Sequence, residues 1–498
     1  MPGQQIETAD FVIVGGGSAG AIIARRLAER TSGRIVLIEA GPSDEHDPTA
    51  LYLSKLDEQQ GLDWGFKATT CPGAPAQLKY LRARMLGGCG NHNDCAYLIP
   101  PDHDFEQWEQ AGAKGWGPDG VSPYFRRIDE RVNIYRFEDI NPICKTFVAA
   151  GRELGYPERD FRAGVADGIG YFPLNSVGDL RHSSSVAYLH PVASLPKHLE
   201  VWTGTMAEKI VIENGRAVGV VTSRGTISAR REVILTAGSL QTPQLLMVSG
   251  IGPAAELHRH GIGVVRDLPG VGNHLLDHVA APVIWQIDRP VGPWQITHLQ
   301  TTMLISIDKA APAPDVLFHF GLRIREKYDA VPIYADVENG VRASPNVARA
   351  RSTGRVTLAS ADIQDAPVID LNYFSDPEGY DLRILREALK FSRRFATTKA
   401  FGSMVVKELA PGPDVLSDAD LEAYMRQTCE TVYHPSGTAV MGDPSRKETV
   451  VGPDLRVKGV DGLRVCDASV FPTMVTVNIN NTVMMIAEKA ADLILAAA

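Results

Sequence analysis

The amino-acid sequence predicts an α/β fold in which a parallel-sheet domain, formed by both ends of the chain, is interleaved with a domain built on an antiparallel sheet and helices. Residues 10–39 show the strand, helix and strand pattern of one complete β-α-β unit. The segment 435–498 returns to mixed α/β character and ends in an apolar helix. Between them, residues 283–360 alternate in a way typical of an antiparallel sheet with one exposed face.

The elements follow in order along the chain. A buried strand is expected at 10–14, a helix at 21–29 and a second strand at 34–39. The stretch 40–125 is rich in Gly, Pro and Asp, so we expect long ordered loops near a cofactor there rather than regular structure. Later elements are a hairpin within 201–221 around Asn214-Gly215, a strand at 232–238, and helices at 381–397, 417–429 and 483–497.

Composition and charge exclude several classes of function. The chain has 498 residues, of which 44% are hydrophobic and 22% charged, so it can bury a large core in two or three domains. Its formal net charge of -9 argues against nucleic-acid binding, which needs a basic surface. We expect a small-molecule partner, and a homodimer is left open.

Targeting and metal signals are also missing from the sequence. The amino terminus has no basic and apolar leader pattern, and no apolar run is long enough for a membrane span. The six cysteines show no CxxC spacing, which argues against a disulfide framework and against a metal site. We therefore expect a protein of the reducing cytoplasm that contacts no membrane.

The glycine loop after the first strand predicts a dinucleotide site. Gly15, Gly17 and Gly20 form G-x-G-x-x-G in a loop that also contains Ser18 and leads into the helix expected at 21–29. Gly15 permits the tight turn, Gly17 lets a pyrophosphate approach the backbone, and Gly20 lets the helix pack on the sheet. The acid at the tip of the next strand, in Glu39-Ala40, is expected to bind the adenosine ribose and argues against NADP. The loop alone does not separate NAD from FAD.

Four longer segments resemble the glucose–methanol–choline (GMC) oxidoreductase family, in the family's order and over about residues 8 to 495. They are 82–94, 238–252, 270–278 and 454–469. The resemblance implies FAD and a p-hydroxybenzoate-hydroxylase-like fold, with a Rossmann-like FAD-binding domain interleaved with a substrate-binding domain. The expected boundaries are 1–155, 196–285 and 435–498 for the first domain, and 156–195 and 286–434 for the second.

Within the family, the chain is most similar to the choline oxidase branch. This likeness is carried by Asn91-His92-Asn93 and by the segments 373–379, 431–438 and 475–480. Alcohol oxidation needs a base for the hydroxyl proton and an acceptor for the hydride. The resemblance implies flavin N5 as the acceptor, His434 as the base, and Asn478 as a second hydrogen-bond donor to the alcohol oxygen.

The resemblance also assigns residues to the cofactor. His92 matches a histidine that is covalently bonded to the flavin 8α carbon in this branch, with ordinary hydrogen bonding as the alternative. Asp467 is expected near the ribityl–pyrophosphate region, with a helix-capping role as its alternative. The remaining cofactor residues implied by the matched motifs are Gly87, Gly88, Asn91, Asn93, Ala468 and Asn480.

Departures from choline oxidase bear on the substrate. The segment 292–300, where a carboxylate for a quaternary ammonium would be sought, contains none. Asp94 replaces a small hydroxyl residue, and Arg349 falls where the branch has an active-site histidine. We expect Asp94, Arg349 and Tyr433 to contact the substrate, with Arg349 binding a polar or anionic part. A scaffold ion pair is the alternative for Arg349, and choline is expected to be a poor substrate.

The predicted activity is oxidation of a polar primary alcohol to an aldehyde or further, with O2 reoxidising the flavin to give H2O2. A dye- or quinone-linked dehydrogenase is the main alternative. A hydroxynitrile lyase with structural FAD and a non-catalytic flavin protein are weaker ones. An NAD-dependent dehydrogenase would leave the segment 454–469 unexplained.

Overall fold

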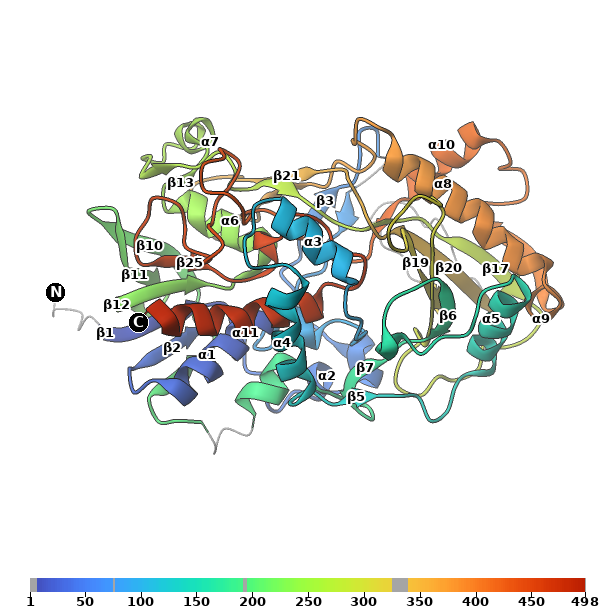
Figure 1. Ribbon diagram of the computed structural model, residues 1–498, viewed down its shortest axis with the longest axis horizontal. Helices are drawn as coiled ribbons and strands as arrows, with labels where there is room; N and C mark the ends of the chain where they lie inside the picture. Colours follow the sequence, from blue (N-terminus) through green and yellow to red (C-terminus); the bar gives the residue numbers. More distant parts are fainter. Residues whose placement is uncertain (1–6, 75–76, 191–194, 325–338, 498) are drawn as a thin grey trace.

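The computed structural model describes residues 7–74, 77–190, 195–324 and 339–497, so part of the predicted strand region 283–360 lies outside the description. The molecule is elongated and has two lobes side by side, with both ends of the chain in the same lobe (Figure 1). Each lobe is built on one large sheet. This arrangement confirms the predicted α/β class with an interleaved chain path.

The first lobe contains a seven-stranded sheet in the order β10-β11-β12-β1-β2-β9, with β25 also paired to β12. The pairs β12–β1, β1–β2 and β2–β9 are parallel, as predicted for the first β-α-β unit. The hairpin turns at Asn214-Gly215, where both residues have positive φ. The strands are β1 (Glu7–Val14), β2 (Ile35–Ile38), β9 (Leu199–Trp202), β10 (Ala207–Glu213), β11 (Arg216–Thr222), β12 (Gly225–Leu235) and β25 (Leu463–Val465).

Helices α1 (Ser18–Arg30) and α11 (Asn480–Ala497) lie against each other beside this sheet (Figure 1). Both start three residues earlier than predicted. Their contact includes an ion pair between Arg26 and the fully buried Glu488, at 2.9 Å. The Tyr188 hydroxyl donates a further hydrogen bond to Glu488, at 2.7 Å. The Arg26–Glu488 ion pair therefore fixes α1 against α11.

The second lobe contains an eight-stranded sheet in the order β23-β17-β20-β19-β18-β6, with β16 and β24 joined beside β20. The neighbouring strands are antiparallel, as predicted. Helix α8 (Tyr380–Arg393) packs on β20, β17 and β19. The strands are β6 (Gly168–Tyr171), β16 (Val279–Ala280), β17 (Val283–Ile287), β18 (Thr301–Ile305), β19 (Val316–Gly321), β20 (Gly340–Val347), β23 (Val405–Ala410) and β24 (Glu430–Thr431).

Two details differ from the sequence-based expectation. Helix α5 (Pro142–Glu153) packs on β6 and β18, although it lies within the predicted segment 1–155 of the first domain, and strand β17 spans the predicted boundary at residue 285. The stretch 40–125 also contains helices α3 (Asp102–Gln110) and α4 (Pro118–Asp129). Their polar sequences and the proline inside α4 hide the helical pattern, because few of their residues are buried.

Smaller elements complete the description. They are α2 (Pro48–Leu51), β3 (Lys67–Thr69), β4 (Leu78–Lys79), β5 (Ile134–Tyr135), β7 (Leu174–Val177), β8 (Leu180–Arg181), α6 (Gly238–Val248), β13 (Ile251–Gly252), α7 (Ala254–Arg259), β14 (Arg266–Asp267), β15 (Asn273–Leu275), β21 (Gly354–Thr357), β22 (Val368–Asp370), α9 (Lys399–Gly402) and α10 (Asp418–Thr428). Helix α10 begins with a capping box between Ser417 and Asp420.

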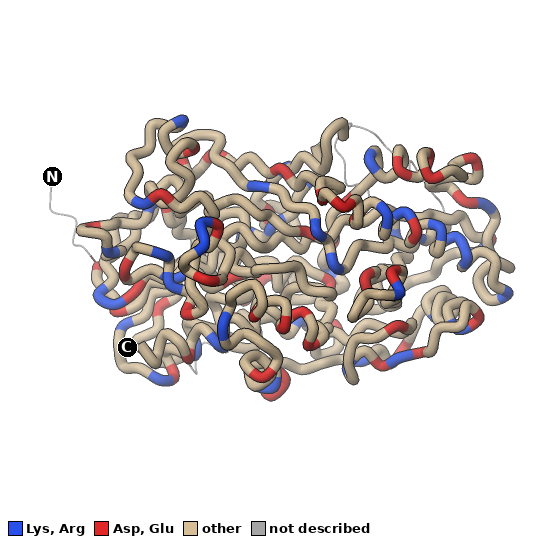
Figure 2. Tube along the Cα trace, turned by 45° about the horizontal axis from the view of Figure 1, so that its top comes forward, with Lys and Arg blue, Asp and Glu red and all other residues tan. Residues whose placement is uncertain are grey.

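Charged residues of both signs are interspersed over both lobes (Figure 2). Many form exposed ion pairs, which contribute about 0–1 kcal/mol each and point to no ligand. Among the described residues, no helix is long and apolar enough to cross a membrane, and no group of acids, histidines and cysteines is placed to hold a metal ion.

Candidate active site

A cavity of about 570 Å³ extends from the carboxyl ends of β1 and β2 to the second sheet. Fifteen of the predicted site residues line it. They are Gly15, Gly17, Ser18, Glu39, Ala40, Gly88, His92, Asn93, Asp94, Tyr433, His434, Asp467, Ala468, Asn478 and Asn480. The cavity lining does not include four other predicted site residues, which are Gly20, Gly87, Asn91 and Arg349.

The glycine loop has the close backbone approaches that a pyrophosphate site requires. Gly15 has φ +105°, and a Cβ on Gly20 would lie 1.9 Å from the Gly15 carbonyl oxygen, so Gly20 acts in packing. Residue Gly17 gives α1 no side-chain cap. The first N–H groups of α1 therefore face the cavity as donors for an anion.

Glu39 is buried at the end of the cavity near β2. Its carboxylate accepts hydrogen bonds from the Gly16 N–H at 2.9 Å and the Gly41 N–H at 2.8 Å. Burial raises the pKa of this carboxyl to about 7, against the effect of these bonds. Glu39 thus fixes the glycine loop relative to β2 and still lines the cavity.

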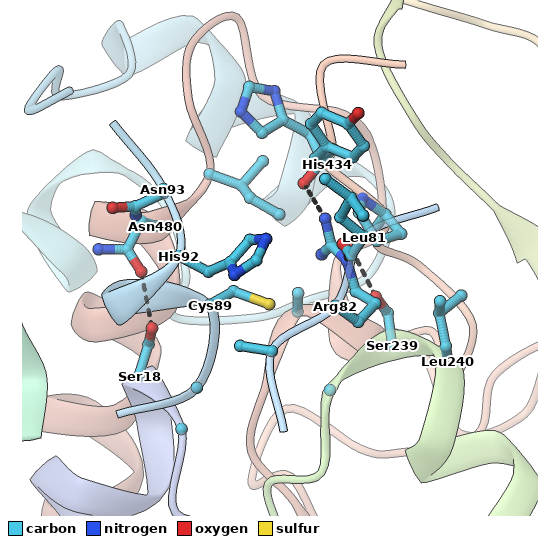
Figure 3. Close-up of a pocket in the computed structure, with 18 of the residues that line it drawn as sticks. Ser18, Leu81, Arg82, Cys89, His92, Asn93, Ser239, Leu240, His434 and Asn480 are labelled. Carbon is cyan, nitrogen blue, oxygen red and sulfur yellow. Dashed lines mark hydrogen bonds between the residues drawn. The ribbon is translucent and has the colours of Figure 1, made fainter. Parts of the chain in front are cut away.

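Two helix N-termini meet in the middle of the cavity. The Ser18 hydroxyl of α1 donates to Asn480 Oδ1 of α11, at 2.7 Å (Figure 3). Asp467 lies nearby and accepts from the Gly238 N–H and from the Ser469 N–H. Its predicted alternative role, helix capping, is therefore present, and it also lines the cavity.

The loop that carries His92 is held by a buried acid that the sequence reasoning missed. Asp44 accepts from Asn91 Nδ2 at 2.6 Å, from the Ser185 hydroxyl and from the His190 ring. Asn91 is fully buried. A Cβ on Gly87 would collide with the side-chain amide of Asn91. Asn91 and Gly87 therefore hold the loop and do not line the cavity, and their contact with the cofactor stays a prediction. His92 and Asn93 line the cavity (Figure 3).

His434 and Asn478 lie together on the cavity wall, as predicted. Asn478 Nδ2 is 3.3 Å from His434 Nε2. His434 follows Tyr433, whose backbone φ of +65° is uncommon for a residue other than glycine. The His434 N–H donates to Asp277 Oδ1 at 2.9 Å, which fixes this turn.

Asp277 and His278 support His434 through contacts that the sequence analysis does not predict. Asp277 is buried and accepts from the hydroxyls of Tyr80, Tyr373 and Thr431, at 2.8, 2.7 and 2.6 Å. The His278 ring contacts the His434 ring, with 2.8 Å between their Nδ1 atoms. Both residues belong to the matched segment 270–278, but that motif does not reveal which ring they would support.

Arg349 lies outside the cavity lining, and its contact with substrate stays a prediction. It forms an ion pair with Asp104 at 3.3 Å. Asp104 also accepts from the Thr476 N–H at 2.6 Å and from its hydroxyl at 3.0 Å. Burial raises the Asp104 pKa to about 6. This is the scaffold alternative, and it supports the loop that carries Asn478.

Arg342 is the arginine of the second sheet that lines the cavity. It lies on β20 and donates from Nε to the Ser344 hydroxyl at 2.6 Å and from Nη2 to Glu430. Glu430 lines the cavity too. Asp94, on the same side, accepts from the Thr297 hydroxyl at 3.1 Å. A charged residue inside an otherwise buried strand was the signal that could have identified Arg342.

Comparisons with known proteins agree with this site. The GMC oxidoreductase family matches its N-terminal region to residues 9–280 and its C-terminal region to residues 350–487. Choline oxidase of Arthrobacter globiformis is 37% identical, over 97% of this chain and 94% of that protein. Mitochondrial choline dehydrogenase of Homo sapiens is 34% identical, over 97% and 89%. The crystal structure of pyridoxine 4-oxidase from Mesorbium loti has a TM-score of 0.89 and 27% identity, over 97% and 98% of the two chains.

Proposed function

This chain belongs to the GMC oxidoreductase family, and we propose that it oxidises a polar primary alcohol to an aldehyde or further, with His434 as the base. The enzyme is an FAD-dependent oxidoreductase. The observation that carries the proposal is the His434–Asn478 pair on the wall of the same cavity as the glycine loop. Bound FAD supplies the acceptor for the hydride of the carbinol carbon.

The cavity fits FAD along its length. Gly15, Gly17 and Ser18 would hold the pyrophosphate at the start of α1, and Glu39 the ribose. Asn93 and Asn480 would hold the flavin ring. The two loops that would hold FAD pack directly on each other, since a Cβ on Gly88 would lie 2.7 Å from Gly17 Cα.

His434 and Asn478 have different roles toward the alcohol. The His434 ring takes the hydroxyl proton, and the Asn478 amide donates to the oxygen as negative charge develops there. An anaerobic mixture with alcohol should bleach the flavin, which a hydroxynitrile lyase would not do. An unbleached flavin with every alcohol tested would overturn the proposal.

The substrate proposed here is not choline. Glu430, one of the carboxylates that line the cavity, is paired with Arg342, so a quaternary ammonium near Glu430 would meet a cation beside the acid. Arg342 is instead suited to a polar or anionic part of the alcohol. A panel of choline, pyridoxine and benzyl alcohol tests this, since these represent substrates in the names of similar proteins. The fastest turnover with choline would contradict the substrate assignment.

O2 is the proposed electron acceptor. Choline oxidase and the oxygen-dependent choline dehydrogenases are 34–37% identical to this chain. H2O2 should form in step with alcohol loss. Rapid dye reduction without peroxide would instead support a dye- or quinone-linked dehydrogenase.

His92 is the proposed covalent tether of the flavin. It follows the buried Gly88–Asn91 turn and lines the cavity. Acid-precipitated protein should stay yellow, and the colour should be released from a His92→Ala variant. A colourless wild-type pellet would show that His92 only contacts the flavin.

We further propose the cytoplasm as the location and a homodimer as the assembly. The six cysteines are all free, and five are buried, which suits a reducing compartment. Cell fractionation and light scattering would test the two assignments.

A further inference from the structure

We propose that His278 sets the tautomer of His434, so that His434 Nδ1 carries the ring proton and Nε2 is left ready to accept the proton of the alcohol. His278 is a positioning residue, since it acts through His434. The tautomer assignment stands on contacts among protein groups. Only the use of Nε2 as the base rests on the proposed function.

On the side away from His434, the His278 ring faces two backbone carbonyl groups. His278 Nε2 lies 3.0 Å from the Ala348 carbonyl oxygen and 2.9 Å from the Val475 carbonyl oxygen. A carbonyl oxygen accepts hydrogen bonds and never donates them. His278 Nε2 must therefore carry a proton, because a lone pair there would face two acceptors.

The other nitrogen of the His278 ring is Nδ1. The residue is 1% exposed, and burial lowers its pKa to about 4. The ring is consequently neutral near pH 7, with its single proton already placed on Nε2. Its Nδ1 atom is thus an acceptor.

The contact between the two rings then determines which His434 nitrogen carries the proton. The two Nδ1 atoms are 2.8 Å apart, a hydrogen-bond distance that requires one proton between them. Since His278 Nδ1 accepts, His434 Nδ1 donates. In a neutral His434 ring, the lone pair then lies on Nε2.

Asn478 gives an independent check of this assignment. Its amide Nδ2, which can only donate, is the atom 3.3 Å from His434 Nε2. Its Oδ1 atom makes no hydrogen bond within the described part of the chain. A protonated Nε2 would instead favour the opposite orientation of the amide.

The support for the base therefore differs from a histidine–carboxylate pair. The Asp277 carboxylate accepts from the backbone N–H groups of His278 and His434. Its other oxygen accepts from the hydroxyls of Tyr80, Tyr373 and Thr431. His434 is thus oriented by the neutral His278 ring and not by a carboxylate.

The direct test is nitrogen NMR of the holoenzyme labelled in its histidine rings, with no alcohol present. A difference spectrum against His434→Gln identifies the two His434 nitrogens. The expected result at pH 7–8 is a protonated Nδ1 and an unprotonated Nε2. A protonated Nε2 would overturn the proposal.

Variants of His278 give a second test. His278→Leu should yield a mixture of His434 tautomers and lower kcat about 10–100-fold, with KM changed less than threefold. His278→Asn should recover part of kcat, because an amide both accepts and donates. The probe is whichever of choline, pyridoxine and benzyl alcohol bleaches the flavin fastest. Unchanged tautomer and kcat in His278→Leu would contradict the proposal.

A matched control separates this effect from general damage. His274, four residues earlier, also has its ring Nε2 beside a carbonyl oxygen, that of Pro472, at 3.1 Å. His274→Asn should leave the tautomer and kcat unchanged, and asparagine tolerates the φ of +63° there. If His434→Gln retains full activity, the proposed base fails while the tautomer assignment can still hold. If His434→Gln is inactive but Nε2 is protonated, only the tautomer assignment fails.

Discussion

The two ends of the cavity are built from different parts of the polypeptide. At the end near β1 and β2, the cofactor would meet mainly backbone N–H groups and glycines from consecutive residues, Gly15 to Ser18. At the other end, the alcohol would meet side chains from segments far apart, including Arg342, His434 and Asn478. A backbone site depends on close approach, whereas a side-chain site depends on hydrogen-bonded support. Substitutions at the two ends should therefore fail in different ways.

The largest effect is expected at the side-chain end. His434→Gln should lower kcat/KM about 10²–10⁴-fold, because a glutamine cannot take the hydroxyl proton. Flavin content should stay near that of wild type, as measured by absorbance. His198→Gln is the control, since the His198 ring lies 3.1 Å from the Ala28 carbonyl, outside the cavity lining. Activity within threefold of wild type in His434→Gln would remove this residue from the mechanism.

The next effect is expected at the backbone end. Gly20→Ala places a Cβ 1.9 Å from the Gly15 carbonyl oxygen, so α1 must shift from the phosphate loop. Flavin should be lost and the melting temperature should fall, with a cost of about 1–3 kcal/mol in unfolding free energy. Gly263→Ala is the control, because nothing lies within 4 Å of a Cβ there. Normal flavin content in Gly20→Ala would contradict a tightly packed loop.

A smaller effect should follow pH at Asp104, beneath the Asn478 loop. Burial raises its pKa from 3.8 to about 6, so the native carboxyl keeps its proton to a higher pH than the unfolded one. Its contribution lowers the unfolding free energy as pH rises from about 4 to about 6, by at most about 3 kcal/mol, and is constant above.

Asp104→Asn should remove this slope in melting temperature against pH. Asp102→Asn, at an exposed position of the same helix, should keep the slope. An identical pH slope in wild type and Asp104→Asn would show that the carboxyl does not titrate there.

The same contrast explains what the sequence could predict. The β-α-β unit, its glycines and Glu39 are consecutive or nearly so, and their spacing indicates both fold and site. His434 and Asn478 were found only through the family motifs. The support by Asp277 and His278 could not be foreseen, because it depends on contacts with Tyr80, Ala348 and Val475, which lie far away in the chain. Arg349 was assigned to substrate because its position in the chain does not reveal its pairing with Asp104.

The smallest effect distinguishes Arg342 from Arg349. Arg342→Lys keeps a cation beside Glu430 but loses the planar guanidinium, which can bind a polar group through two parallel hydrogen bonds. KM for the best alcohol of the panel should rise about tenfold, which corresponds to about 1.4 kcal/mol, while kcat stays within threefold. Arg349→Lys is the matched control and should leave KM unchanged, because Arg349 does not line the cavity. Removing Arg342 outright is a poorer test, since breaking this buried ion pair with Glu430 would cost about 3–5 kcal/mol. An equal KM in both lysine variants and the wild type would mean that the Arg342–Glu430 pair supports the sheet, and that substrate selection lies elsewhere in the cavity.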